Sequence, residues 1–211
     1  MKLDLQIPEQ FFAPFSQPFK LKEYKERLNE FGEWSKEHFN LIPVYTLVTS
    51  RAKFVDFVLS NVWQHAELDK EKDISLIAVG GYGRKELHPE SDIDLLLLSK
   101  KAIKPDVKEK ISLFLTTLWD LKFDVGHAVR TIKDTLVAGK EDIQTATNLM
   151  ERRLICGNGK NFDTLCKELT HKKFISSKYF YLAKREEQEE RHRRYHSTSY
   201  NLEPNLKANP G

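Results

Sequence analysis

The sequence predicts an α+β fold, in which a small mixed β-sheet is surrounded by helices and followed by a helical extension. Three runs have the length and apolar content of strands: residues 74–79, 92–99 and 123–131. Segments with helical spacing precede the first run, separate the second from the third, and fill the chain after Asp134. Helices on a small sheet are a stable layered arrangement, because each element buries its apolar face against another.

The N-terminal part combines an aromatic segment with two predicted helices. Residues 8–19 hold three prolines among four phenylalanines, which is too rich in proline for a helix and too aromatic to stay free in water. We therefore expect this segment to lie along the surface of the domain. Residues 20–38 and 41–68 place apolar side chains at helical spacing and predict two helices before the sheet.

Most of the chain after the second predicted strand is predicted to be helical. Residues 107–121 form a helix between the second and third strands, since apolar positions recur there at helical spacing. After Asp134 we expect helices, with breaks near Gly139, at residues 157–159 and near Ser176. The chain thus divides into N-terminal helices (1–70), a sheet core (71–135) and a helical extension (136–211).

Composition limits the classes of partner and the compartment. The 34 basic and 31 acidic residues give a net charge of only +3, which is too weak to indicate a nucleic-acid partner. Cys156 and Cys166 lack a second pair or histidines at zinc spacing, so we expect idle thiols in a reducing cytoplasm. No run approaches the roughly 18 apolar residues of a membrane span, so no membrane partner is expected.

Two aspartates at the start of the second predicted strand carry most of the chemical information. Side chains of a strand alternate between faces, so Asp92 and Asp94 point the same way while Ile93 enters the core. Neighbouring carboxylates repel each other unless a positive charge lies between them. Mg²⁺ supplies such a charge, and it commonly takes one or two carboxylates together with nucleotide phosphates. Mn²⁺ is an alternative.

A glycine pair just before these aspartates predicts a site for phosphates. Gly80 and Gly81 let the backbone approach a polyphosphate without an intervening Cβ, and Arg84 and Lys85 add positive charge. Ser91 either contributes a hydroxyl contact or only caps the turn. Each feature alone is usually a turn or a surface group. It is the combination of apolar strand, glycine pair, paired aspartates and apolar strand that indicates a nucleotidyltransferase site.

Gly-Gly followed by Asp-x-Asp at this spacing resembles the DNA polymerase beta-like nucleotidyltransferases. The sequence of residues 79–94 resembles that of the N-terminal domain of the bifunctional PII uridylyltransferase/uridylyl-removing enzymes of bacterial nitrogen signalling. Further similar segments are residues 118–120, 125–131, 142–149, 191–195 and 200–207. In that family the last segment continues beyond the point where this chain stops, so the resemblance implies a truncated chain without the hydrolase and ligand-sensing domains.

The resemblance implies transfer of UMP from UTP to a tyrosine hydroxyl of the PII protein, with Asp92 and Asp94 holding Mg²⁺. Polymerase beta-like enzymes generally carry a third carboxylate on the third strand, where Asp124 is the acid present; His127 and Asp142 compete for this role. In sister adenylyltransferases the acid lies nearer the position of Gly126. Two alternatives remain open, namely an adenylyltransferase-type relative and a non-catalytic binding module.

Residues 184–195 form a densely charged run. Its default interpretation is a solvated helix with ion pairs at i,i+4, such as Glu187 with Arg191 and Glu190 with Arg194.

Overall fold

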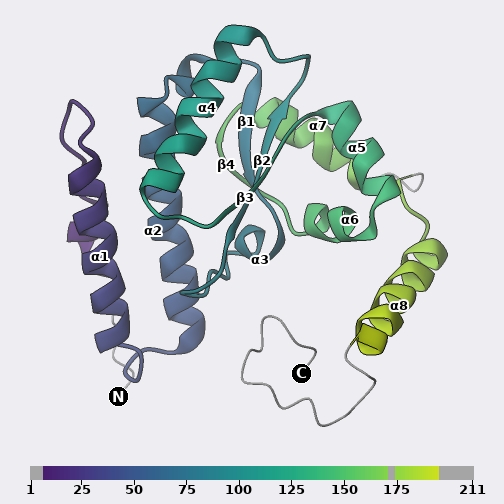
Figure 1. The fold of residues 1–211 in the computed structure, drawn as a ribbon, viewed down its shortest axis with the longest axis horizontal. Coiled ribbons are helices and arrows are strands. Elements are labelled where there is room, and N and C mark those ends of the chain that lie inside the picture. The colour runs from purple at the N-terminus through teal and green to yellow at the C-terminus, as the bar shows by residue number, and fades with distance from the viewer. Residues whose placement is uncertain (1–6, 171–173, 195–211) are drawn as a thin grey trace.

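A four-stranded mixed sheet forms the centre of the protein in the computed structural model, which describes residues 7–170 and 174–194 (Figure 1). The strand order is β3-β2-β1-β4. β1 pairs antiparallel with β2 and with β4, whereas β2 pairs parallel with β3. The strands are β1 (Ile74–Ala78), β2 (Ile93–Ser99), β3 (Val125–Thr131) and β4 (Arg153–Gly157). This arrangement confirms the predicted α+β class with a small mixed sheet.

Three long helices come from the first 120 residues of the chain. They are α1 (Leu21–Glu37), α2 (Val44–His65) and α4 (Pro105–Asp120), and they agree with the predicted helices to within a few residues. α2 and α4 cover one face, where alternate residues of β1 and β2 join a single apolar core (Figure 1). That core contains side chains from both sides of residue 70, and the predicted division into three parts stays a prediction.

The opposite face of the sheet is covered by helices from the second half of the chain. These are α5 (Ile132–Glu141), α6 (Ile143–Met150) and α7 (Gly159–Thr170). A second apolar core on this face contains Ile77, Val79, Leu96, Leu98, Leu149 and Leu165. Because β1 and β2 supply buried side chains to both cores, these strands lack the simple alternation of polar and apolar residues.

The aromatic N-terminal segment packs against α1 and α2. It contains a short 3₁₀ helix, η1 (Glu9–Phe12), and buries Phe11 and Phe15. The ring of Phe15 stacks on Tyr24 of α1 with 3.6 Å between centroids. A second 3₁₀ helix, η2 (Leu68–Lys70), joins α2 to β1.

One prediction for the second half of the chain was wrong. β4 lies in a region that we expected to be wholly helical. Its five residues carry no strand pattern of their own, and they form a strand by pairing with β1. The break predicted near Gly139 lies at Asp142, between α5 and α6, and Gly139 itself lies inside α5. A Cβ at this position would come within 2.8 Å of the Phe174 ring, so this glycine permits close packing.

The charged run forms most of α8 (Ser177–Arg194), as predicted. Lys184 pairs with Glu187 at 2.6 Å, and Arg185 pairs with Glu189 at 3.2 Å. The predicted pairs of Glu187 and Glu190 involve arginine side chains that lie outside the described part of the chain. In residues 7–170 and 174–194, no helix is long and apolar enough to cross a membrane.

The environment of Cys156 generates a first testable prediction. Both cysteines are free thiols, and burial raises the pKa of the Cys156 thiol to about 12. Only the thiolate is nucleophilic, so we expect iodoacetamide at pH 8 to modify Cys156 at least about a hundredfold more slowly than in the unfolded chain. Mass mapping of the alkylated peptides measures this rate. Modification of the folded protein at the unfolded rate would contradict this environment.

Candidate active site

The carboxylate of Asp94 lies between two glycine backbones. Asp94 is the second residue of β2, and its partner in the parallel register is Gly126 of β3. A Cβ built on Gly126 would come within 2.3 Å of Asp94 Oδ1. On the other side, Gly80 has a φ of +60° and its Cβ position lies 3.4 Å from Asp94 Oδ2. Side chains at either position would crowd the carboxylate.

A hollow of about 170 Å³ opens beside this carboxylate. β3 contributes Arg130 to its wall, and α6 contributes Thr145 and Asn148. The Oδ1 atom of Asn148 lies 3.5 Å from the Cβ position of Gly80, so α6 closes the site from the side opposite β3. None of these three side chains was among the predicted site residues. For Arg130 a signal existed, because strand alternation places it on the face of Gly126.

Asp92 and Asp124 lie side by side where the parallel pair begins. The amide of Ile93 donates to the carbonyl oxygen of Asp124 at 2.9 Å, and Ile93 is in register with Val125. Extending this register by one residue pairs Asp92 with Asp124, on the face that carries Asp94. Asp92 is half-buried and Asp124 is exposed. The backbone register thus brings Asp92, Asp94 and Asp124 to the same end of the β2–β3 pair.

The glycine pair opens a single helical turn, α3 (Gly80–Gly83). The first amides of such a turn have no carbonyl partner inside it and remain available to an anion. This turn is hydrogen-bonded to the strand that carries the carboxylate, because the Val79 amide donates to the Asp94 carbonyl oxygen at 3.0 Å. Ser91 lies in the following turn, where its amide donates to the His88 carbonyl oxygen at 3.1 Å.

Arg84 ends this helical turn with its guanidinium beside Gly81 and paired with two carboxylates. Its Nε lies 2.9 Å from Glu86, and its NH1 group contacts Glu151. Hydrogen bonds to Glu86, which has the larger effect, and to Glu151 raise the pKa of Arg84 above its usual value. Lys85 is exposed and has a φ of 66°.

The two competitors for the third carboxylate make other side-chain contacts. His127 points to the other face of β3, where its ring meets Trp119 of α4 edge-on with 5.9 Å between centroids. Asp142 is the N-cap of α6, and its side chain accepts hydrogen bonds from the amides of Gln144 and Thr145. Asp124 stays the predicted third carboxylate.

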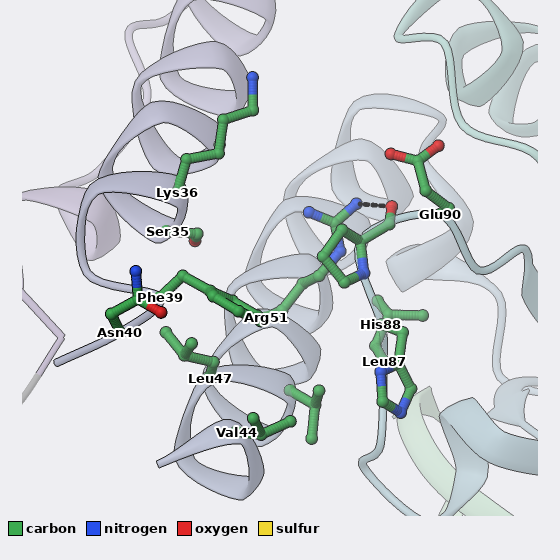
Figure 2. Close-up of a pocket in the computed structure, with 13 residues that line it drawn as sticks. Ser35, Lys36, Phe39, Asn40, Val44, Leu47, Arg51, Leu87, His88 and Glu90 are labelled. Atoms are coloured by element: carbon green, nitrogen blue, oxygen red, sulfur yellow. Dashed lines mark hydrogen bonds between the residues drawn. The ribbon is translucent and has the colours of Figure 1, made fainter. Parts of the chain in front are cut away.

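A larger hollow of about 440 Å³ lies between α1, α2 and the segment that leads to Asp92 (Figure 2). Its wall is largely apolar, with Phe39, Val44 and Leu47 facing Leu87. It contains no pair of carboxylates, so the smaller hollow beside Asp94 is the better candidate for chemistry.

Comparison with known proteins identifies the kind of domain that contains this hollow. Residues 59–156 match the family model of the nucleotidyltransferase domain, and residues 179–211 match the model of GlnD PII-uridylyltransferase. The chain is 47% identical, over 97% of its length, to the bifunctional uridylyltransferase/uridylyl-removing enzyme of Vibrio cholerae. It is 49% identical over 90% of its length to the enzyme so named in Vibrio campbellii. The chain contains a nucleotidyltransferase domain homologous to that of the PII uridylyltransferases.

The chain spans about a quarter of these relatives, covering 24% of the Vibrio cholerae enzyme and 22% of the Vibrio campbellii enzyme. The similarity therefore applies to the nucleotidyltransferase domain and its flanking helices. Residues 59–156, which match the nucleotidyltransferase family model, include every predicted site residue from Gly80 to Asp124.

The site of this nucleotidyltransferase domain suits a magnesium ion carried in with a nucleotide. Within the described residues, no group of three or more His, Cys, Asp and Glu side chains forms a metal cluster. Mg²⁺ usually takes only one or two carboxylates and completes its shell with water and phosphate oxygens. Asp94 lines the hollow of about 170 Å³, and Asp92 lies two residues before it, so the residues present supply the carboxylates that this mode of binding uses.

The cap of α6 generates a second prediction. Asp142→Ala should lower the free energy of unfolding by about 1 kcal/mol at pH 7, because the first amides of α6 lose their acceptor. Hydrogen bonds lower the pKa of Asp142: the one from the Thr145 side chain has the largest effect, followed by those from the Thr145 and Gln144 amides. Because the pKa of Asp142 is lower in the folded than in the unfolded protein, its ionised carboxylate stabilises the fold at pH values above the unfolded-state pKa. This stabilisation is lost as the pH falls through the folded-state pKa.

The measurement is urea unfolding of wild type and variant between pH 3 and pH 7, at pH values where both remain folded. Asp142→Asn is the matched control, since it keeps an N-cap acceptor and removes the titration. A difference between wild type and Asp142→Ala that stays constant down to pH 3 would exclude this role.

Proposed function

We propose that this domain transfers UMP from UTP to a tyrosine hydroxyl of a PII signalling protein and releases pyrophosphate. The observation that carries the proposal is the Asp94 carboxylate between Gly80 and Gly126, next to the glycine turn. The similarity to named uridylyltransferases supports UTP as the donor and PII as the acceptor. The free thiols suit the cytoplasmic location that we include in the proposal.

In the proposed reaction the tyrosine oxygen attacks the α-phosphorus of UTP. A bond forms between these atoms, and the bond from the α-phosphorus to the oxygen that bridges to the β-phosphate breaks. A magnesium ion held by Asp92 and Asp94 would offset the charge that develops on the phosphate oxygens. Asp124 is the proposed acceptor of the phenolic proton, because a free tyrosine with a pKa of about 10 is mostly neutral at pH 7.

The remaining residues are assigned to binding of the triphosphate. The amides of Gly80 and Gly81 would donate to phosphate oxygens, and Arg84 would add a charge-assisted contact. Lys85 is exposed at the same turn, and Ser91 is close enough in sequence to Asp92 to contribute a hydroxyl.

The deciding experiment incubates the protein with PII and Mg²⁺, with labelled UTP and labelled ATP in separate reactions. Intact mass of PII then shows whether a uridylyl or an adenylyl group has been added. Uridylyl addition supports the proposal, whereas adenylyl addition favours the adenylyltransferase alternative. Nucleotide binding that needs no metal, without any transfer, would indicate a non-catalytic module.

Loss of either proposed metal ligand should abolish transfer without unfolding the protein. Asp92→Asn and Asp94→Asn each remove a negative charge that the metal requires, so we expect transfer to fall about a thousandfold or more. Single-turnover transfer to PII measures the rate, and circular dichroism checks the fold. Asp163→Asn, on the exposed surface of α7, is the control. Activity within tenfold of wild type would refute the assignment.

Adding one methyl group at Gly126 should also impair transfer. The new Cβ would lie 2.3 Å from Asp94 Oδ1, so the carboxylate must turn away while the strand remains paired. A displacement of about 1 Å at a reacting group costs about a hundredfold in rate. We expect a loss of that size for Gly126→Ala in the same assay, with little change in the melting temperature.

The matched control is Gly32→Ala in α1, where an added Cβ meets nothing within 4 Å. It should leave transfer unchanged and slightly stabilise the helix. Equal effects of the two alanines on transfer would show that the close approach at Gly126 is not important.

A further inference from the structure

A cluster of three side chains joins the glycine turn to α2 and β4. The carboxylate of Asp56, on α2, accepts a hydrogen bond of 2.6 Å from the Tyr82 hydroxyl. It also accepts two hydrogen bonds from Arg153 of β4, at 2.7 and 3.0 Å. The same guanidinium donates to the Tyr82 carbonyl oxygen at 3.2 Å. The cluster therefore holds both the side chain and the backbone of the turn.

Burial makes these contacts stronger than surface pairs. The Tyr82 side chain is 2% exposed. Its pKa is raised well above the usual value by burial and, second, by the charge of Asp56, so the hydroxyl stays a neutral donor. The hydrogen bonds of Asp56 involve a charged acceptor in each case and, from Arg153, a charged donor as well. Such charge-assisted bonds are stronger than neutral ones.

The place of Tyr82 in the sequence gives the cluster its importance. Tyr82 lies between Gly81 and Gly83, and glycines lose more conformational freedom on ordering than other residues. A four-residue helix has little stability of its own. The position of the Gly80 and Gly81 amides relative to Asp94 therefore depends on contacts from outside the turn, and Tyr82 is the residue of this turn whose side chain makes such contacts.

We propose that Asp56, Tyr82 and Arg153 are positioning residues, which order the glycine turn for the triphosphate of the incoming nucleotide. The inference rests on the proposed function for the identity of that ligand. It assigns no contact with substrate to the three side chains, which act through the backbone of α3. A second hydrogen bond from α2 supports the inference. Arg51 donates to the Pro89 carbonyl oxygen at 2.9 Å, in the segment before the aspartates (Figure 2).

The test compares Tyr82→Phe and Asp56→Asn with wild type. Hydrogen exchange without nucleotide follows the amides of Gly83 and Arg84, which close the turn by donating to the Val79 and Gly80 carbonyl oxygens. Loss of a charge-assisted bond should speed their exchange about tenfold in Tyr82→Phe, and more in Asp56→Asn, while β2 amides stay unchanged. Steady-state transfer should show a KM for UTP raised about tenfold, with a smaller change in kcat.

Two further variants separate positioning from general stability. Thr117→Val removes another buried hydroxyl, which donates within α4 at 2.8 Å, and it should change neither turn exchange nor KM. Arg153→Lys keeps the charge but not the two-pronged contact, so its effects should be smaller than those of Arg153→Ala.

Unchanged turn exchange in both Tyr82→Phe and Asp56→Asn would overturn the inference. Faster exchange with an unchanged KM for UTP would also overturn it, because the turn would then be ordered for another purpose. Failure of the wild-type protein to use UTP counts against the proposed function instead. The exchange comparison contains no nucleotide, so the two failures are distinguishable.

Discussion

The carboxylate of Asp94 occupies its position because two neighbouring residues have no side chain. Gly126 faces it across the β2–β3 pair, and Gly80 faces it from the start of α3. Both approaches are made by backbone, so the site is fixed by sheet register and by the conformation of one turn. A register slip of one residue between β2 and β3 would replace Gly126 by a side chain and turn the carboxylate away from the hollow.

The same strand supplies core and site because its side chains alternate. On the face covered by α5, α6 and α7, β2 buries Leu96 and Leu98. Asp94 is the next residue of this face and lies where the apolar core gives way to the hollow beside Asn148. The opposite face of β2 is apolar along its length and packs on α2 and α4. One fully buried face thus keeps the strand in place while the end of the other is left for chemistry.

Local patterns predicted most elements and the residues of the motif. Strand alternation placed Asp92 and Asp94 on one face, and helical spacing located α1, α2 and α4 to within a few residues. Nonlocal contacts escaped prediction. β4 is defined by pairing with β1, and Asp56 meets Arg153 across 97 residues of sequence. No periodicity marks such contacts, because their cause is the assembled fold rather than the local chain.

Gly126 shows how a missing side chain escapes sequence analysis. The resemblance to adenylyltransferases predicts an acid near this position. The structure shows that the position touches the Asp94 carboxylate itself. A glycine there leaves room for one acid rather than adding another, and Asp124, whose carbonyl oxygen accepts from the Ile93 amide, stays the proposed third carboxylate.

The ion pairs of Arg84 are compatible with its proposed contact to phosphate when magnitudes are compared. Its side chain is 45% exposed, and those of Glu86 and Glu151 are 38% and 31% exposed. Ion pairs this accessible to water contribute about 0–1 kcal/mol each. A hydrogen bond to a charged phosphate contributes about 1.5–3 kcal/mol, and a triphosphate carries more charge than one carboxylate. Exchange of partners would therefore favour the nucleotide, with Glu86 and Glu151 keeping the guanidinium beside Gly81 until it binds.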